Sequence, residues 1–269
     1  MALSDVEVAI TAAEAGADVV ARGYGVDHER FAKSGTDFAT QIDLDAERAI
    51  FAVLDEHRAA DARVGEESGA FAGDGGGRRW FIDPLCGTIN YAAATPLVAV
   101  NVALRDEGAD VAAAVADPIA REIFWTDGTR AALRAGGRDL ELSPSARSRL
   151  VEVNCDGPLD QCFVGGSLVG DPRLRARYGP RVISTTLGVV WVAAGRRAAY
   201  VSDGQVSDSL HFAAGVALCA SAGCVVTDLA GGPVSGGRGL LIAADISTHA
   251  DMLEIISPHL EATGAPPAG

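Results

Sequence analysis

One stretch constrains this chain more than any other: an apolar run that ends in a proline turn and leads at once into glycine and threonine. Residues 80–90 read W-F-I-D-P-L-C-G-T-I-N. A strand that stops at such a turn delivers side chains and backbone N–H groups to one edge of a sheet. If a helix starts at Gly87-Thr88, its free N–H groups form an anion site, and Asp83 can hold a cation beside it. The alternative is an ordinary strand, turn and helix cap with Asp83 in solvent.

Length and charge limit the class of protein. The chain has 269 residues, of which 48% are hydrophobic and 22% charged, so it can bury a large core as one domain or as two packed halves. Its formal net charge is −14. Because no basic cluster offsets that charge, we expect neither a nucleic acid nor an anionic membrane as partner.

Acidic residues interrupt the apolar residues at the N-terminus, and no apolar run approaches bilayer length. We therefore expect no signal peptide and a soluble, cytoplasmic protein. The five cysteines are an odd number without C-x-x-C spacing. That pattern argues against a disulfide framework.

Hydrophobic periodicity predicts the elements of the first half. Residues 5–22 have helical spacing, and residues 36–43 open a second helix whose buried stripe continues to Leu54. Three apolar segments separated by turn residues predict an antiparallel meander over 97–104, 111–116 and 122–126.

After a polar connector at 143–149, the second half alternates between strand-like and helix-like segments. We expect these elements: a strand at 150–154, a helix at 158–169, an apolar run around 189–194, a helix from about 207 to 224, a strand at 236–244 and a helix at 249–260. The Ala-Pro-Pro tail is expected to be disordered.

Three motifs together carry a family resemblance. Residues 83–90 follow a D-P-x-D-G-T-x-N pattern with one change, residues 65–68 read G-E-E-S, and residues 210–215 follow W-D-x-A-A-G with changes. This set resembles the inositol monophosphatase-like family of metal-dependent phosphatases, over nearly the whole chain.

The resemblance implies a layered α+β and α/β fold, the αβαβα sandwich of the inositol monophosphatase and fructose-bisphosphatase type. It implies an α+β half at 1–145 with an antiparallel sheet and the metal and phosphate motifs, and an α/β half at 146–269 with a mixed sheet. The two halves are expected to pack as one compact unit. The family is commonly homodimeric, which the sequence neither supports nor excludes.

The resemblance also assigns site residues. Glu66, Asp83 and the Leu85 carbonyl would hold the metal ion, while Glu67 and Thr88 would position the attacking water. Without the family, adjacent acids such as Glu66 and Glu67 usually mark a solvated turn.

Further positions match the family's supporting and substrate-binding residues. Lys33, Thr40 and Asp43 would stand behind the metal site, although Asp43 could equally be a helix cap. Gly87, Thr88 and Ser184 would bind the phosphorylated substrate. Ile183 replaces the glycine that precedes this serine in the family.

Two metal-ligand positions depart from the family: Cys86 replaces the second aspartate of the first motif, and Leu210-His211 replaces W-D in the other. One interpretation is loss of Mg²⁺, which prefers hard oxygen ligands, down to a single weakly held ion or none. Another is conversion to a Zn²⁺ or Fe²⁺ site through Asp83, Cys86 and His211. In further alternatives Asp208 supplies the lost carboxylate, or Cys86 acts as a nucleophile if the fold places His211 beside it.

We therefore expect a divergent member of this family that binds a small phosphorylated polyol, sugar or nucleotide-type ligand. Its Mg²⁺-dependent phosphomonoester hydrolysis would be weakened or redirected, with Glu66, Glu67, Asp83, Thr88, Cys86 and His211 as the catalytic candidates. The alternative is a non-hydrolytic member, which is either a binding protein or an enzyme of another reaction type in the same pocket. Fold alone does not decide between them.

Overall fold

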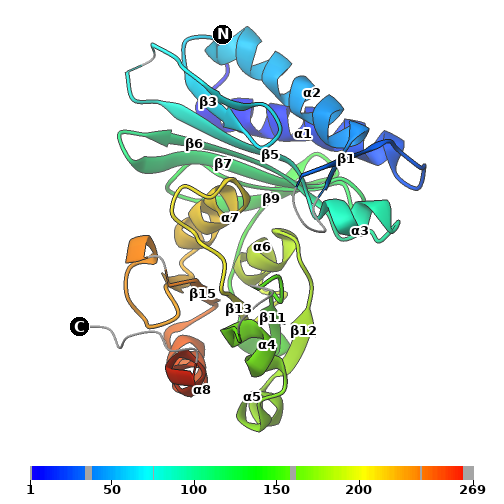
Figure 1. The fold of residues 1–269 in the computed structure, drawn as a ribbon. Coiled ribbons are helices and arrows are strands. Elements are labelled where there is room, and N and C mark those ends of the chain that lie inside the picture. Colours follow the sequence, from blue (N-terminus) through cyan, green and yellow to red (C-terminus); the bar gives the residue numbers. More distant parts are fainter. Residues whose placement is uncertain (1, 34–37, 75, 158–161, 237, 263–269) are drawn as a thin grey trace. The chain divides into compact units, whose positions relative to one another are not determined.

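A computed structural model of the chain describes residues 2–33, 38–74, 76–157, 162–236 and 238–262 (Figure 1). The chain divides into two compact units, and each is described by itself. The first unit consists of residues 1–141, 185–187 and 210–221, and the second contains the remainder. The predicted boundary at 145/146 and the predicted packing of both halves as one compact unit stay predictions.

The first unit has an eight-stranded sheet in the order β10-β9-β8-β7-β6-β5-β3-β4. Its pairs are antiparallel except β3 with β5, which is parallel, so the sheet predicted as antiparallel contains one parallel pair. The strands are β3 (Ala62–Gly65), β4 (Gly69–Phe71), β5 (Arg79–Cys86), β6 (Ala99–Asp106), β7 (Ala109–Asp117), β8 (Glu122–Thr126), β9 (Ala131–Ala135) and β10 (Arg138–Glu141). The predicted meander is confirmed and extends by two further strands. A separate pair joins β1 (Arg30–Ala32) to β2 (Phe38–Thr40).

Helices cover both faces of this sheet (Figure 1). Two long helices, α1 (Asp5–Gly23) and α2 (Gln41–Arg58), pack on one face, and α7 (Leu210–Ser221) packs on the other against β5, β6 and β7. Alternate residues of β5 and β6 therefore point to different layers. Trp80 and Ile82 join the core under α1 and α2, while Asp83 faces the α7 side.

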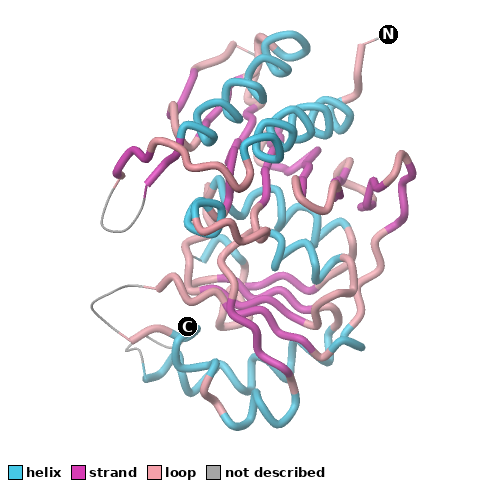
Figure 2. Tube along the Cα trace, turned by 90° about the vertical axis from the view of Figure 1, so that its right-hand side faces the viewer, coloured by secondary structure: helices cyan, strands magenta, loops and turns pink. Residues whose placement is uncertain are grey.

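The second unit has a five-stranded mixed sheet in the order β12-β11-β13-β15-β14. Its strands are β11 (Leu150–Val153), β12 (Gly179–Val182), β13 (Ala199–Ser202), β14 (Val225–Thr227) and β15 (Leu240–Ala243). Its helices are α4 (Val164–Val169), α5 (Pro172–Arg177), most of α6 (Leu187–Ala193) and α8 (Ile246–Ala262), with short turns η1 (Ala146–Ser148) and η2 (Val234–Gly236). The strands lie side by side in Figure 2, and helices α4, α5 and α8 bury apolar side chains against them. The mixed sheet predicted here is confirmed.

The second predicted helix begins later than expected. Residues 34–37 lie outside the described part, and residues 38–40 form β2 instead of a first turn. Thr40 is the N-cap, since its side chain accepts from the Ile42 N–H while Asp43 accepts from the Thr40 N–H. This reciprocal capping starts the helix at Gln41.

Three other predicted boundaries are wrong, one because of a remote capping side chain and two because of a glycine with positive φ. Residues 158–161 of the predicted 158–169 helix lie outside the described part, and α4 begins only at Val164, where the Asp203 carboxylate accepts the first free N–H groups. The helix expected to reach 224 ends at Ser221, because Gly223 has φ +86°. The strand expected from 236 begins at Leu240, after Gly239 with φ +78°.

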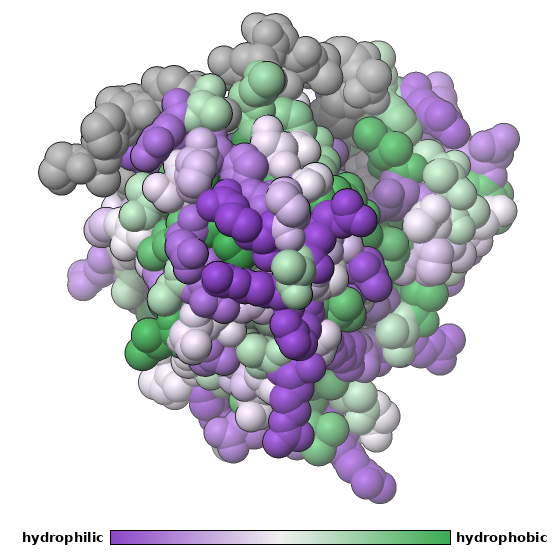
Figure 3. Space-filling view, turned by 90° about the horizontal axis from the view of Figure 1, so that it is seen from below, coloured by the Kyte–Doolittle hydropathy of each residue, from purple (hydrophilic) through white to green (hydrophobic). Residues whose placement is uncertain are grey.

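Hydrophilic and hydrophobic residues are interspersed on the face shown in Figure 3, with strongly hydrophilic ones near its centre. Within the described residues, none of the helices is both long and apolar enough to cross a bilayer. The Ala-Pro-Pro tail lies outside the described residues.

The packing of α2 on α1 generates a stability prediction. Ile50 is fully buried, and a Cβ built on Gly16 of α1 would lie 2.9 Å from its Cδ1, so the two helices approach closely here. We expect Ile50→Ala to lower the free energy of unfolding by about 2–5 kcal/mol and Ile50→Val by about 0.5–1.5 kcal/mol. The exposed Arg48→Ala should change it by less than about 0.5 kcal/mol. Urea unfolding measures all three, and equal values for Ile50→Ala and Arg48→Ala would contradict the assigned core.

Candidate functional site

The site begins at an irregularity in strand β5. Asp83 pairs with Asn101 of β6, yet Cys86 pairs with Ala99, so β5 carries one extra residue between these pairs. This β-bulge lies at Pro84, which has no N–H to offer the ladder. Without it, residues three apart in a strand would point to opposite faces. The bulge places Asp83 and Cys86 on the same face of the sheet.

Asp83 is fully buried and accepts several hydrogen bonds. Its Oδ1 accepts from the Leu85 N–H at 3.2 Å, and its Oδ2 accepts from Asn101 Nδ2 at 3.2 Å. His211 Nδ1 lies 2.7 Å from the same Oδ2. A buried carboxylate needs such partners, because ionisation without them is very unfavourable.

His211 comes from the first turn of α7, which lies on this face of the sheet. Although Asp83 is fully buried, the His211 side chain is 51% exposed. The Cys86 Sγ, one ring nitrogen of His211 and one carboxylate oxygen of Asp83 all lie within 4.8 Å of one another. Among the residues that the structure describes, these three form the group of His, Cys, Asp and Glu side chains that could share a metal ion.

Thr186 connects the members of this cluster. Its backbone N–H lies 3.3 Å and its Oγ1 3.0 Å from Cys86 Sγ, and both can donate to the sulfur. The same Oγ1 lies 2.9 Å from Asn101 Nδ2 and 3.2 Å from the His211 carbonyl oxygen. Asn101 Nδ2 therefore donates both to Asp83 and to Thr186, and a continuous polar network joins β5, β6, residue 186 and α7.

The charges of the cluster are strongly coupled. Burial opposes ionisation of Asp83, but the neighbouring His211 and the hydrogen bonds from His211, Glu66 and Asn101 outweigh it and lower the pKa of this carboxyl. The Asp83 charge, with its hydrogen bond, raises the pKa of His211 to about 12. Burial and the Asp83 charge raise the pKa of the Cys86 thiol, against the opposing effect of His211 and Thr186. Asp83 and His211 therefore form an ion pair beside a thiol.

Lys33 links the two adjacent acids predicted from the G-E-E-S motif. Its Nζ lies 2.8 Å from Glu66 Oε1 and 2.6 Å from Glu67 Oε1. Burial and the nearby Asp83 charge raise the pKa of Glu66 to about 8, although His211 and Lys33 oppose the shift. The buried Glu47 accepts from the Glu67 N–H at 3.0 Å, which fixes the turn after β3.

A third group joins the start of α2 to the turn after β5. Asp43 is buried and accepts from the Thr40 side chain at 2.6 Å and from Thr88 Oγ1 at 3.0 Å. Burial raises the pKa of Asp43 against these hydrogen bonds. Thr88 also lies within donating distance, 3.1 Å, of the Leu85 carbonyl oxygen. Asp43 is thus both a helix cap, the alternative weighed from sequence, and a partner of Thr88.

The turn itself has the conformation that the glycine suggests. Gly87 adopts φ +98° and ψ +40° and is the N-cap of α3 (Thr88–Ala92). A residue with a Cβ is strained in this left-handed region. The helix start expected at Gly87-Thr88 is therefore present, in a helix of five residues.

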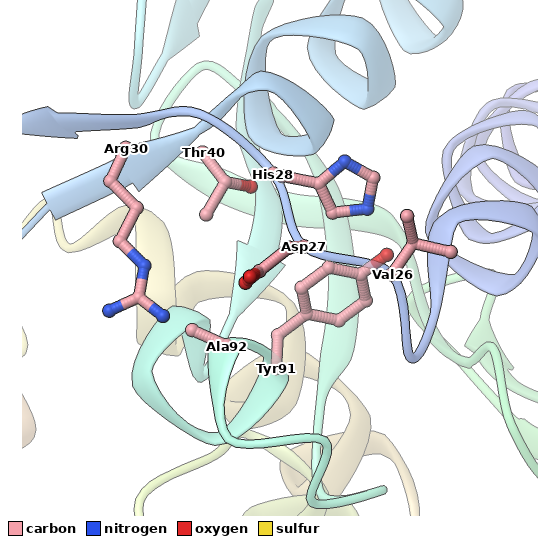
Figure 4. Close-up of a pocket in the computed structure, with 7 residues that line it drawn as sticks. All are labelled: Val26, Asp27, His28, Arg30, Thr40, Tyr91 and Ala92. Carbon is pink, nitrogen blue, oxygen red and sulfur yellow. The ribbon is translucent and has the colours of Figure 1, made fainter.

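Thr40 also lines a small pocket together with residues of the segment 26–30 and with Tyr91 and Ala92 (Figure 4). In Figure 4 the Asp27 side chain points into it between Arg30, Thr40 and Tyr91. Its volume of about 10 Å³ leaves room for about one water molecule. The pocket is therefore too small for a sugar or cyclitol phosphate.

The structure brings together within the first unit all the predicted site residues except Ser184. Ser184 belongs to the second unit, where its hydroxyl donates to the Asp156 carboxylate, and its predicted role in substrate binding stays a prediction. Asp208 also belongs to the second unit, and its backbone has φ +55°. The suggestion that it replaces the lost carboxylate stays untested.

Sequence reasoning assigned no role to Asn101, Thr186 or Glu47. Asn101 is the one polar residue in the apolar run 97–104, and a buried strand rarely carries such a residue without a partner. That signal could have identified Asn101. Thr186 carries no comparable signal, since a threonine beside an apolar helix is ordinary.

The oxygen donors fit Mg²⁺ poorly. Both Asp83 oxygens accept hydrogen bonds, Glu66 is held by Lys33, and the Leu85 carbonyl lies within reach of Thr88. The two remaining positions carry a thiol and an imidazole, whereas Mg²⁺ requires near-octahedral oxygen ligation. The donor set at this site is therefore not one that suits magnesium.

Comparison with known proteins places this chain in a family. Residues 3–261 match the sequence profile described as the inositol monophosphatase family. An inositol-1-monophosphatase of Mesorhizobium japonicum is 32% identical over 238 residues, covering 86% of each chain. A Nus factor SuhB of Pseudomonas aeruginosa is also 32% identical, over 85% of this chain and 86% of its own.

Solved structures agree on the fold. The extragenic suppressor protein SuhB of Bartonella henselae superposes with a TM-score of 0.82 at 27% identity, covering 93% of this chain and 97% of its own. An IMPase of Thermotoga maritima gives a TM-score of 0.83 at 20% identity, covering 97% of this chain and all of its own. The predicted fold of the inositol monophosphatase and fructose-bisphosphatase type is confirmed.

The ion pair generates a pH prediction for chelator-treated protein. The pKa of His211 is higher in the folded protein than in the unfolded chain. Its contribution to the free energy of unfolding is therefore complete below the unfolded-state pKa of about 6.5 and is lost as pH rises towards the folded-state pKa. The pKa of Asp83 is lower in the folded protein, so its contribution to the free energy of unfolding is lost as pH falls below the unfolded-state pKa of about 4. The destabilisation by His211→Gln should therefore be larger at pH 5.5 than at pH 9.5. Urea unfolding of the native protein and of His211→Gln at each pH measures this destabilisation. An equal destabilisation at pH 5.5 and pH 9.5 would contradict the ion pair.

Proposed function

Since the chain belongs to the inositol monophosphatase family, we propose that it binds a small phosphorylated polyol, sugar or nucleotide-type ligand and that its magnesium-dependent phosphomonoester hydrolysis is weakened or redirected. The contact that carries this proposal is the 2.7 Å approach of His211 Nδ1 to Asp83 Oδ2, with Cys86 on the same face. A carboxylate that a resident imidazole already neutralises has little charge left for a hard cation.

The phosphate side of the site supports retained ligand binding. Gly87 leaves the backbone free of a Cβ at the start of α3, and Thr88 is held beside it through Asp43 and the Leu85 carbonyl. Glu67 and Lys33 remain in contact with each other, as the family pattern implies for a positioned water. Ser184 is proposed as a further ligand contact.

A second candidate keeps metal-dependent chemistry but changes the ion. The cluster of Asp83, Cys86 and His211 offers one carboxylate, one thiol and one imidazole within 4.8 Å, which favours Zn²⁺ or Fe²⁺ over Mg²⁺. In that case the hydrolysis is redirected and the three residues hold the ion.

A third candidate is a non-hydrolytic protein, either a binding protein or an enzyme of another reaction type that uses Cys86 and His211. The observation that favours it is that relatives at similar identity are named Nus factor SuhB, which is not the name of an enzyme. A homodimer, the lack of a nucleic-acid or membrane partner, and a cytoplasmic location stay predictions from the sequence.

Restoring the family's ligands tests the proposal. We expect the double variant Cys86→Asp, His211→Asp to release phosphate from a panel of sugar and cyclitol phosphates at least about tenfold faster than the native chain in Mg²⁺, which corresponds to about 1.4 kcal/mol of transition-state stabilisation. The measurement is inorganic phosphate released with and without Mg²⁺.

A matched control identifies the cause of any change. Adding Glu66→Gln to the double variant should abolish the gain, because the restored site then lacks a predicted ligand. A native chain that already hydrolyses the panel in Mg²⁺ as fast as the double variant would show that hydrolysis is not weakened. No turnover by either protein would leave the non-hydrolytic candidate.

A further inference from the structure

We infer that Asp83, Cys86 and His211 form a zinc site, and that Thr186 is the residue that positions the Cys86 sulfur for it. The inference deepens the proposed function and rests on it for the identity of the site, but metal binding can be measured without any substrate. Nothing in the family pattern assigns a role to Thr186.

The donor set is the first argument. Zn²⁺ binds thiolate, imidazole and carboxylate in tetrahedral sites with bonds of about 2.0–2.3 Å, so its donors lie roughly 3.3–3.7 Å apart. The three donors here already lie within 4.8 Å of one another, so they need to move by only about 1 Å. In the ion pair, His211 Nδ1 carries the proton that it donates to Asp83 Oδ2. Zinc replaces that proton and the thiol proton, and both are released to solvent.

The hydrogen bonds to sulfur are the second argument. The Thr186 N–H and hydroxyl approach Cys86 Sγ at 3.3 and 3.0 Å, so the sulfur faces two donors. Asn101 Nδ2 donates to Thr186 Oγ1, which directs the single hydroxyl proton away from Asn101. That proton can go to the sulfur at 3.0 Å or to the His211 carbonyl at 3.2 Å. Two donors on one sulfur suit a metal-bound thiolate, because hydrogen bonds of this kind orient and stabilise metal ligands.

Asn101 supplies the third argument. Its side chain is fully buried, and within the described structure its Oδ1 has no hydrogen-bond partner while its Nδ2 donates to Asp83 and Thr186. Leaving a buried acceptor unpaired is energetically unfavourable. The amide thus directs its donors at the cluster although its acceptor is left unpaired, as expected for a group that holds a metal-binding carboxylate in place.

The number of protein donors indicates the type of site. Structural zinc sites have four protein ligands, whereas sites with three leave one position for water or substrate. This cluster has three, and the half-exposed His211 places it within reach of solvent. A zinc ion here would have an open position next to the predicted phosphate-binding turn at Gly87.

Cobalt is a suitable probe, because Co²⁺ occupies zinc sites and reports thiolate ligation by a charge-transfer band in the near ultraviolet. Chelator-treated full-length protein is titrated with Co²⁺ and then with Zn²⁺, and zinc content is measured by elemental mass spectrometry. We expect one Co²⁺ per chain with the thiolate band, and its displacement by one Zn²⁺. Cys86→Ser should abolish the band, while Cys162→Ser, which removes an exposed thiol elsewhere, should retain it.

Thr186 has its own test. Thr186→Val keeps the shape and the backbone donor but removes the hydroxyl, and it should weaken zinc binding by about 10–100-fold and shift the cobalt band. Thr186→Ser, which keeps the hydroxyl, should retain the native zinc affinity and the native cobalt band. Circular dichroism and thermal melting of each variant confirm that it folds, so a loss of binding is not mistaken for unfolding.

Specific outcomes overturn the inference. Binding of Co²⁺ without a thiolate band, a band that persists in Cys86→Ser, or less than one equivalent of bound zinc rules out the site. Native zinc affinity in Thr186→Val rules out the role of Thr186. Phosphate release from the panel is measured separately, so failure of the proposed hydrolysis and failure of the zinc site are distinguishable.

Discussion

The arrangement of the site depends on one extra residue in a strand. The bulge at Pro84 lets Asp83 and Cys86, three positions apart, point to the same face of β5. That face is covered by α7, so both side chains meet His211. A regular strand would have turned one of the two into the core beneath α1 and α2. The bulge therefore makes any chemistry shared by these side chains possible.

The buried charge of Asp83 sets the electrostatics around it. A fully buried carboxylate must be compensated, and a phosphatase of this family would use metal ions for that purpose. Here His211 supplies the positive charge directly, at 2.7 Å. Cys86 stands where a second carboxylate would repel Asp83, so the substitution also removes a like charge. With His211 as the counter-charge and Cys86 in place of a second carboxylate, the charge of Asp83 is balanced by side chains of the first unit.

Several features were predictable because they depend on short-range patterns. Helical spacing located α1 and α2, apolar segments separated by turn residues located the meander, and the motif residues located the turn at Gly87. Boundaries were less predictable where the decisive partner is remote. The N-terminus of α4 is set by Asp203, about 40 residues further along the chain. Asn101 could have been identified as a lone polar residue in an apolar strand, whereas Thr186 could not.

By itself the sequence determined the resemblance to the family, the two long helices and the three strands of the meander, and it led to the interpretation that Cys86 and His211 replace two metal-ligand positions. It could not determine that these two residues meet, because they are 125 positions apart and their contact depends on strand register, on the bulge and on the packing of α7. Only the tertiary structure decided that the thiol faces Thr186 and that the imidazole pairs with Asp83. Side-chain contacts of this kind depend on the distances between elements in the folded chain, whereas a sequence pattern indicates only the elements themselves.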